Sequence, residues 1–149
     1  MQQIFRKLKF KDLYSVNIMI NKYLPETMRM VCLTSLFGLK PNFSFVSVSN
    51  DSITGYILAE KKEENIEIIS LCVDRNCRKK GLASRLIINI IQKGKDDSLD
   101  NIILYVRVKN IKAIRLYKKL GFVKKMYLKN FYAPNKPGYK MVLNLKKNM

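Results

Sequence analysis

The clearest candidate for chemistry is a short basic segment between a predicted strand and a predicted helix. Arg78, Lys79 and Lys80 precede Gly81, and an apolar helical pattern begins at Leu82. A helix N-terminus offers unpaired backbone N–H groups and a partial positive charge, and glycine allows the backbone to approach a ligand closely. This composition is typical of a phosphate-binding turn, although a solvated basic turn capping a core helix would have the same residues. It matches neither the Walker A loop nor the dinucleotide-binding fingerprint.

A second candidate segment follows a later predicted strand. Asn110, Ala113 and Tyr117 stand at intervals of three and four residues, so a helix would place them on one face. A small residue between two polar ones suits a ligand that lies along that face. The alternative is that Tyr117 is an ordinary core aromatic, which is the commoner fate of a single tyrosine.

Missing residue types exclude several classes of enzyme. The chain has no histidine and only three cysteines, Cys32, Cys72 and Cys77. A Ser-His-Asp or Cys-His nucleophilic centre is therefore impossible. A zinc site would have too few ligands, so we expect no metal.

The chain is strongly basic, with a formal charge of +18. Residues 101–149 contain thirteen Lys or Arg and no acid. One explanation is compositional, because Lys outnumbers Arg 22 to 7, as in proteins of AT-rich genomes. The other is attraction to phosphate, for example in ribosomal RNA. Either way, the charge disfavours a free cationic substrate such as a polyamine.

Hydrophobic periodicity and turn residues predict alternating strands and helices within one domain over residues 1–149. Asn50-Asp51 predicts a hairpin turn, and Gly94 and Gly121 are each expected to end a helix. The predicted strands are residues 3–9, 43–48, 53–60, 65–73, 102–108, 122–131 and 139–145, and the predicted helices are residues 11–24, 26–36, 82–92 and 110–120. No apolar run reaches the roughly 18 residues that span a bilayer, and no signal peptide is recognisable, so we expect a cytoplasmic protein without a membrane partner.

Taken together, the two candidate segments resemble the GNAT superfamily of acetyltransferases. Residues 78–83 match its Arg/Gln-x-x-Gly-x-Gly/Ala signature, and Asn110, Ala113, Leu116-Tyr117 and Gly121-Phe122 match its later helix. The resemblance covers nearly the whole chain. It implies an α/β (α+β three-layer) fold, with a mixed, mostly antiparallel central sheet of about seven strands flanked by about four helices.

The same resemblance implies acetyl-CoA as the cofactor. The turn would bind the pyrophosphate, the backbone of residues 71–73 would pair with the pantetheine arm, and the later helix would line the acetyl and thiol end. The residues implied to bind the cofactor are Leu71, Cys72, Val73, Arg78, Lys79, Lys80, Gly81, Leu82, Ala83, Asn110 and Tyr117.

A finer resemblance is to the catalytic subunits of N-terminal acetyltransferases. Leu24-Pro25-Glu26 is similar to a segment of the NatA type, whereas residues 104–110 (Leu-Tyr-Val-Arg-Val-Lys-Asn) are closer to the NatB type. Residues 55–59, residues 69–73, Phe131-Tyr132-Ala133 and Tyr139-x-Met141 also resemble segments of these subunits.

Three departures from that pattern concern the acceptor side. Pro137-Gly138 replaces an acidic pair, Met28 replaces a tyrosine, and Tyr105 stands where the NatA type has histidine. Acceptor choice is therefore less determined by the resemblance than cofactor use.

The resemblance implies a direct attack of an α-amine on the thioester, with Glu26 as general base and Tyr117 as the acid for the departing thiolate. Glu26 could instead be an exposed acid at the start of a helix. Tyr132 and Tyr139 could instead be packing residues of the last two strands. Cys72 is expected in strand packing and not as a nucleophile. The residues implied to bind the acceptor are Leu24, Pro25, Glu26, Tyr105, Tyr132 and Tyr139.

Two alternatives remain open at this point. The acceptor could be a protein lysine or a ribosomal protein, or the chain could be a basic ribosome- or RNA-binding module without catalysis. The expected partners are a protein or nascent-chain N-terminus, an auxiliary helical subunit that docks on the first two helices (with Leu33, Leu36 and Phe37), and rRNA through the basic residues 101–149.

Overall fold

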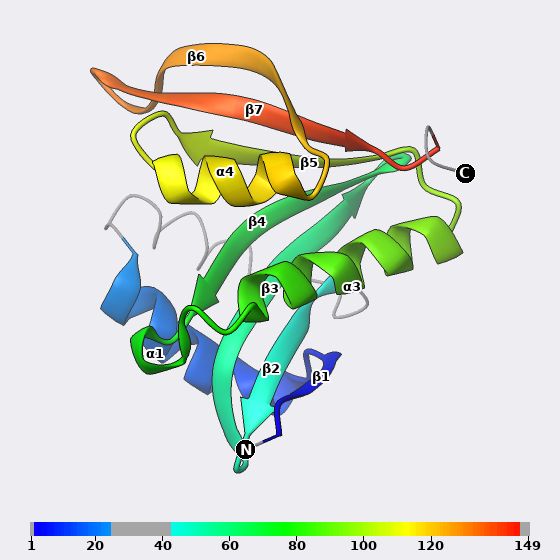
Figure 1. The fold of residues 1–149 in the computed structure, drawn as a ribbon, viewed down its shortest axis with the longest axis vertical. Coiled ribbons are helices and arrows are strands. Elements are labelled where there is room, and N and C mark those ends of the chain that lie inside the picture. Colours follow the sequence, from blue (N-terminus) through cyan, green and yellow to red (C-terminus); the bar gives the residue numbers. More distant parts are fainter. Residues whose placement is uncertain (1, 25–42, 147–149) are drawn as a thin grey trace.

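The computed structural model describes residues 2–24 and 43–146 and is organised around one seven-stranded sheet (Figure 1). The strands are β1 (Ile4–Lys7), β2 (Phe45–Ser49), β3 (Ser52–Lys62), β4 (Asn65–Val73), β5 (Asn101–Arg107), β6 (Val123–Ala133) and β7 (Lys136–Asn144). The helices are α1 (Leu13–Tyr23), α3 (Leu82–Asp96) and α4 (Ile111–Lys119), with 3₁₀ turns η1 (Phe10–Asp12) and η3 (Arg75–Cys77). The strand order is β1-β2-β3-β4-β5-β7-β6, and only β4 and β5 are parallel neighbours.

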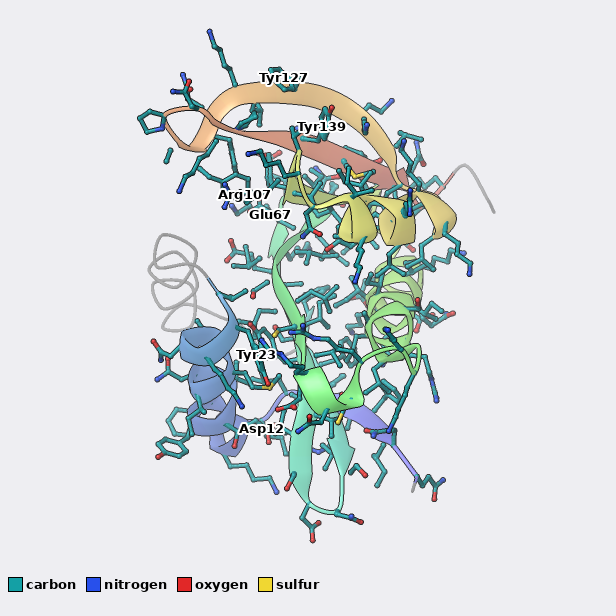
Figure 2. The ribbon with its side chains drawn as sticks, turned by 60° about the vertical axis from the view of Figure 1, so that its left-hand side comes forward. Asp12, Tyr23, Glu67, Arg107, Tyr127 and Tyr139 are labelled. Carbon is teal, nitrogen blue, oxygen red and sulfur yellow. The ribbon has the colours of Figure 1, made fainter. Side chains whose placement is uncertain are left out.

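The helices cover the two faces of the sheet. On one face, Val16, Met19 and Ile20 of α1 are buried in one apolar cluster with residues of β2 and β3. On the other, Leu86, Ile87 and Ile90 of α3 are buried in a larger cluster, as their helical spacing requires. Figure 2 shows α1 on one side of the sheet, and α3 and α4 on the other. Within residues 2–24 and 43–146, no helix is long and apolar enough to cross a membrane.

A bulge in β4 changes which side chains face each helix layer. Leu58 pairs with Ser70 but Ala59 pairs with Ile68, so Ile69 is an extra residue in β4. As a result, Ile68 and Leu71 both pack with the α3 cluster, while Ile69 packs with the α1 cluster. Bulges bend a strand and increase its twist, so β4 changes direction at the centre of the sheet.

The mixed seven-stranded sheet confirms the predicted fold. The described residues contain three of the four expected helices, and the predicted helix over residues 26–36 lies outside them. Asn50 and Asp51 form the predicted hairpin turn, with φ angles of 51° and 63°, and Gly121 follows α4 with a φ of 104°.

The expectation that Gly94 ends α3 was wrong. The helix continues to Asp96, and Gly94 is a buried residue within it. A Cβ atom at this position would lie 2.6 Å from Cδ1 of Leu145 and 3.2 Å from Cδ1 of Ile66. The glycine is therefore explained by the close approach of α3 to the sheet, which the sequence pattern does not reveal.

An ion pair fixes the start of α1. The two terminal guanidinium nitrogens of Arg6, on β1, donate to the carboxylate of Asp12 at 2.8 and 2.9 Å. The backbone N–H of Lys9 donates to the same carboxylate at 2.7 Å. Asp12 is only 4% exposed, and the hydrogen bonds from Arg6 lower its pKa below the ordinary value. This pair sets where α1 begins relative to the sheet.

Replacement of Asp12 by Asn is expected to lower the free energy of unfolding at pH 7 by about 3 kcal/mol, because it leaves Arg6 without its charge partner. The folded-state pKa of Asp12 lies below the unfolded value near 4, so the stabilisation is complete above that value and is lost as the pH falls through the folded-state pKa. Urea unfolding at pH 7 and pH 3 measures both effects. Asp51→Asn, at an exposed turn, is the matched control, and an Asp12→Asn variant with wild-type stability at pH 7 would contradict the assignment.

Candidate active site

The site lies where the two parallel strands separate. β4 and β5 pair only through residues 65–67 and 101–103, and Figure 1 shows the two strands diverging beyond that point. Two cavities occupy this region. The turn-side cavity, of about 480 Å³, reaches the segment that follows β4. The tyrosine-side cavity, of about 270 Å³, lies against β5 and β6 and is lined by Tyr105, Arg107 and Tyr132.

The two cavities share part of their lining. Tyr23, Leu24, Leu71, Asn110 and Tyr117 line both. These residues come from the end of α1, from β4 and from α4. Groups entering from the two cavities would therefore meet beside Leu71 and Tyr117.

The segment Arg78–Ala83, here called the phosphate turn, has the geometry expected of an anion site. Lys79 and Gly81 have positive φ angles of 67° and 75°. Gly81 is the N-cap residue of α3, and no side chain caps the first turn of that helix. The first backbone N–H groups of the 15-residue helix α3 thus face the turn-side cavity without a side-chain acceptor, which is the arrangement that binds phosphate.

Arg78 is held in place at the edge of the turn-side cavity. Its Nε donates to the carbonyl oxygen of Val73 at 2.9 Å, and its guanidinium carbon lies 5.0 Å from the centre of the Tyr23 ring. Lys79 and Lys112 also line this cavity, whereas Lys80 does not. Two of these positive charges, Arg78 and Lys79, belong to the turn that leads into α3, and Lys112 belongs to α4.

Asn110 caps the helix that carries Tyr117. Its side-chain oxygen accepts the backbone N–H of Ala113 at 3.3 Å. Asn110 and Ala113 both line the turn-side cavity with Tyr117, so the face predicted from their spacing is present. The cap sets the start of α4 and therefore the direction in which Tyr117 points.

Burial raises the pKa of the Tyr117 hydroxyl to about 12, with a smaller contribution from nearby Tyr132. Burial also raises the pKa of Tyr132 to about 12, although Arg107 lowers it in part. Both phenols are consequently protonated at neutral pH. They can donate hydrogen bonds in the cavities but cannot serve as bases there.

The tyrosine-side cavity is shaped by ring contacts. Tyr105 stacks on Phe131 at 4.7 Å between ring centres, and Arg107 lies 5.7 Å from the centre of the Tyr132 ring. A Cβ on Gly138 would lie 2.8 Å from Cε2 of Tyr132, so the glycine leaves room for that ring. Within the described residues, neither cavity is lined by an Asp or a Glu.

Some predicted site residues lie elsewhere. Tyr139 lines neither cavity; it pairs across the strands with Val106, and its ring contacts Tyr127 at 5.9 Å. Opposed residues share a face, and Val106 faces the α3 cluster, so Tyr139 packs on that face. Pro25 and Glu26 lie outside the described residues. Cys72, by contrast, is buried in the α1 cluster and also lines the turn-side cavity.

Several residues of the site were not among the site residues predicted from the sequence. Cys77, Ser84 and Lys112 line the turn-side cavity, Arg107 lines the tyrosine-side cavity, and Tyr23 lines both. Lys112 follows Asn110 by two residues, so its place on α4 could have been noted. The part of the chain that the structure describes holds no group of three or more His, Cys, Asp or Glu arranged to bind a metal.

Comparison with known proteins agrees with this arrangement. The model of the acetyltransferase (GNAT) family matches residues 10–122, which include both α1 and the whole of α4. The chain belongs to this family. It is 34% identical over 110 residues to an N-alpha-acetyltransferase of Saccharolobus solfataricus, covering 65% of this chain and 66% of that protein. It is 27% identical over 141 residues to N-alpha-acetyltransferase 30 of Dictyostelium discoideum, covering 92% of this chain and 75% of that one.

A solved structure of the GNAT fold is closely similar. Ard1 from Thermoplasma volcanium superposes with a TM-score of 0.86 and 26% identity, covering 97% of this chain and 98% of that one. The likeness extends over all layers of the sheet and helices. The fold predicted for this GNAT chain is therefore confirmed by an independent structure.

Replacement of Asn110 by Ala is expected to destabilise the protein by about 1 kcal/mol, because the first turn of α4 loses its cap. Asn110→Ser, which keeps a capping oxygen, is expected to retain most of the stability. Urea denaturation of the two variants measures the difference. Equal loss in both would show that the cap contributes little and that Asn110 is placed for another reason.

Proposed function

We propose that this protein transfers an acetyl group from acetyl-CoA to the N-terminal α-amine of a protein or nascent chain. The observation that carries the proposal is the meeting of the two cavities at Leu71, Asn110 and Tyr117. One cavity ends at an anion-binding turn and the other is lined by tyrosines. The relatives named N-alpha-acetyltransferase support the α-amine as acceptor.

Acetyl-CoA fits the turn-side cavity by its chemistry. The phosphate turn would bind the diphosphate through the backbone N–H groups at the start of α3, with Arg78 and Lys79 supplying full charges. Beyond Glu67, β4 has no strand partner on its β5 side in the part of the chain that the structure describes. The backbone of Leu71–Val73 would therefore be available to pair with the amides of the pantetheine arm.

The reaction needs little help from a base. An α-amine has a pKa of about 7.7–8.0, so roughly a tenth is already neutral at pH 7. The neutral nitrogen attacks the acetyl carbonyl, a C–N bond forms and the C–S bond of the thioester breaks. The nitrogen then loses one proton, and the thiolate leaves. Glu26 stays the predicted acceptor of that proton, through a water or directly.

Tyr117 would act on the departing sulfur as a hydrogen-bond donor. Its pKa of about 12 exceeds the value of about 8.5 for an ordinary thiol, so a complete proton transfer to the thiolate would cost about 5 kcal/mol. A hydrogen bond from the phenol still stabilises the developing negative charge in this dehydrated site. The structure thus favours stabilisation by Tyr117 over complete protonation, which solvent can provide after release.

The alternative acceptors fit less well. A lysine amine, with a pKa near 10.4, is less than one part in a thousand neutral at pH 7 and would need a strong base. The one base predicted for the site, Glu26, would have to act on an amine whose neutral fraction is several hundredfold lower than that of an α-amine. The match to the acetyltransferase (GNAT) family over residues 10–122 supports an enzyme over a binding module without catalysis.

Two kinds of partner are proposed besides the acceptor. Phe10, Tyr14 and Ile18 repeat every four residues along η1 and α1 and are 86%, 77% and 48% exposed, which suits docking of an auxiliary helical subunit. The basic residues 101–149 suit contact with rRNA. Both partners stay predictions, and so does the contribution of Leu33, Leu36 and Phe37 to docking of the auxiliary subunit. The single domain over residues 1–149 and the cytoplasmic location also stay predictions.

The acceptor proposal predicts where the acetyl group appears. Peptides varied at their first two positions, each with an internal lysine, are incubated with the protein and acetyl-CoA. Fragmentation mass spectrometry should find acetyl on the α-amine, and N-terminally blocked versions of the same peptides should remain unmodified. Acetylation of the lysine in the blocked peptides would contradict the proposal.

Replacement of Tyr117 by Phe should lower kcat on the order of tenfold to a hundredfold, because one hydrogen bond to the developing thiolate is lost. The dissociation constant of CoA, measured by calorimetry, should change less than about twofold. Tyr127→Phe is the control, because Tyr127 is 57% exposed on β6 and lines neither cavity. Unchanged turnover in Tyr117→Phe would remove Tyr117 from the chemical step.

A further inference from the structure

Tyr23 connects parts of the molecule that are far apart in sequence. It is the last residue of α1, it is half-buried, and it lines both cavities. Its hydroxyl accepts the backbone N–H of Arg75, 52 residues later, at 3.2 Å. Figure 2 places Tyr23 between α1 and the loop that leads into α3.

The same side chain supports Arg78. The guanidinium of Arg78 lies over the Tyr23 ring at 5.0 Å, while its Nε donates to Val73 on β4. Arg78 is thus held at two points, and among residues 2–24 and 43–146 no hydrogen bond from its two terminal nitrogens competes with a ligand. Arg75 is the first residue of the 3₁₀ turn η3, and Arg78 follows its last residue. Tyr23 therefore contacts both ends of the segment that leads into the phosphate turn.

Packing of α1 does not depend mainly on this ring. Val16 and Ile20 are fully buried and Met19 is 5% exposed, and these residues anchor the helix on the sheet. Tyr23 lies one turn further along, at the mouth of the cavities. Tyr23 also packs against this apolar cluster, but its hydroxyl and its ring contact Arg75 and Arg78 of the segment that leads into α3.

We propose that Tyr23 is a positioning residue that pre-organises Arg78 and the phosphate turn for the diphosphate of the bound cofactor. This inference rests on the proposed use of acetyl-CoA. A free arginine loses much rotamer freedom when an anion fixes it, and an arginine that is already held loses less. The ring of Tyr23 holds the guanidinium of Arg78, and its hydroxyl binds the backbone of η3 at Arg75.

The test compares variants at position 23. Tyr23→Leu removes the ring and should weaken CoA binding about tenfold by calorimetry, the combined size of one cation–π contact and one newly mobile arginine. Tyr23→Phe keeps the ring and should stay within about threefold of the wild type, since water can replace the hydroxyl at the exposed Arg75 N–H. Tyr127→Leu, an equal truncation away from the cavities, should bind CoA as the wild type does.

A truncated donor separates positioning from general damage. S-acetylpantetheine lacks the diphosphate, so the Tyr23→Leu change should lower kcat/KM for this donor clearly less than for acetyl-CoA, even though Tyr23 lines both cavities. In the background of Arg78→Gln, the Tyr23→Leu change should weaken CoA binding much less than tenfold, because the two residues act together. If Tyr23→Leu lowers the melting temperature, Tyr23→Met replaces it with the same expectations.

The inference is overturned if Tyr23→Leu binds CoA as tightly as the wild type, or if it loses activity equally with both donors. Neither result would touch the proposed function, which requires only that the wild type bind and use acetyl-CoA. Conversely, a wild-type protein that binds no CoA would defeat the proposed function before any variant is compared. The two failures are therefore distinguishable in one set of measurements.

Discussion

The early end of the pairing between β4 and β5 is the constraint on which the rest of the site depends. The two strands are parallel neighbours over only three residue pairs, and the bulge at Ile69 lies just beyond them. A helix follows each strand, so α3 and α4 both begin beside the opening. Backbone groups at the centre of a sheet need partners, and an opening at that place suits a ligand that carries amide groups.

The charges are arranged to match two different substrates. Arg78, Lys79 and the first N–H groups of α3 lie at one end, where the diphosphate would lie, whereas Tyr105, Tyr132 and Arg107 line the other. Burial keeps Tyr117 and Tyr132 protonated. An acceptor amine that is partly neutral at physiological pH needs the least help from a base, so it suits such a site best.

The tyrosines show how much of the site can be predicted from residue type alone. Tyr105, Tyr117 and Tyr132 line the cavities, but Tyr139 packs against the α3 cluster, on the face that its cross-strand partner Val106 shares. An alternating sequence pattern shows which residues of a strand share a face. Which face of the sheet they occupy is known only when the register with the neighbouring strand is known. Tyr23 was missed for a related reason: its contacts with Arg75 and Arg78 join segments that no local pattern connects.

The sequence by itself determined the features that depend on neighbours a few positions away. These include the helical stripe after Gly81, the breaker at Gly121 and the hairpin at Asn50-Asp51, since propensity and turn chemistry act within one or two turns. Only the tertiary structure decided the insertion of β7 between β5 and β6, the bulge that opens the sheet, the close packing that explains Gly94, and the contact of Tyr23 with the phosphate turn. These features follow from strand pairing and side-chain packing between distant segments, whose energies are set by the whole core and not by any local run of residues.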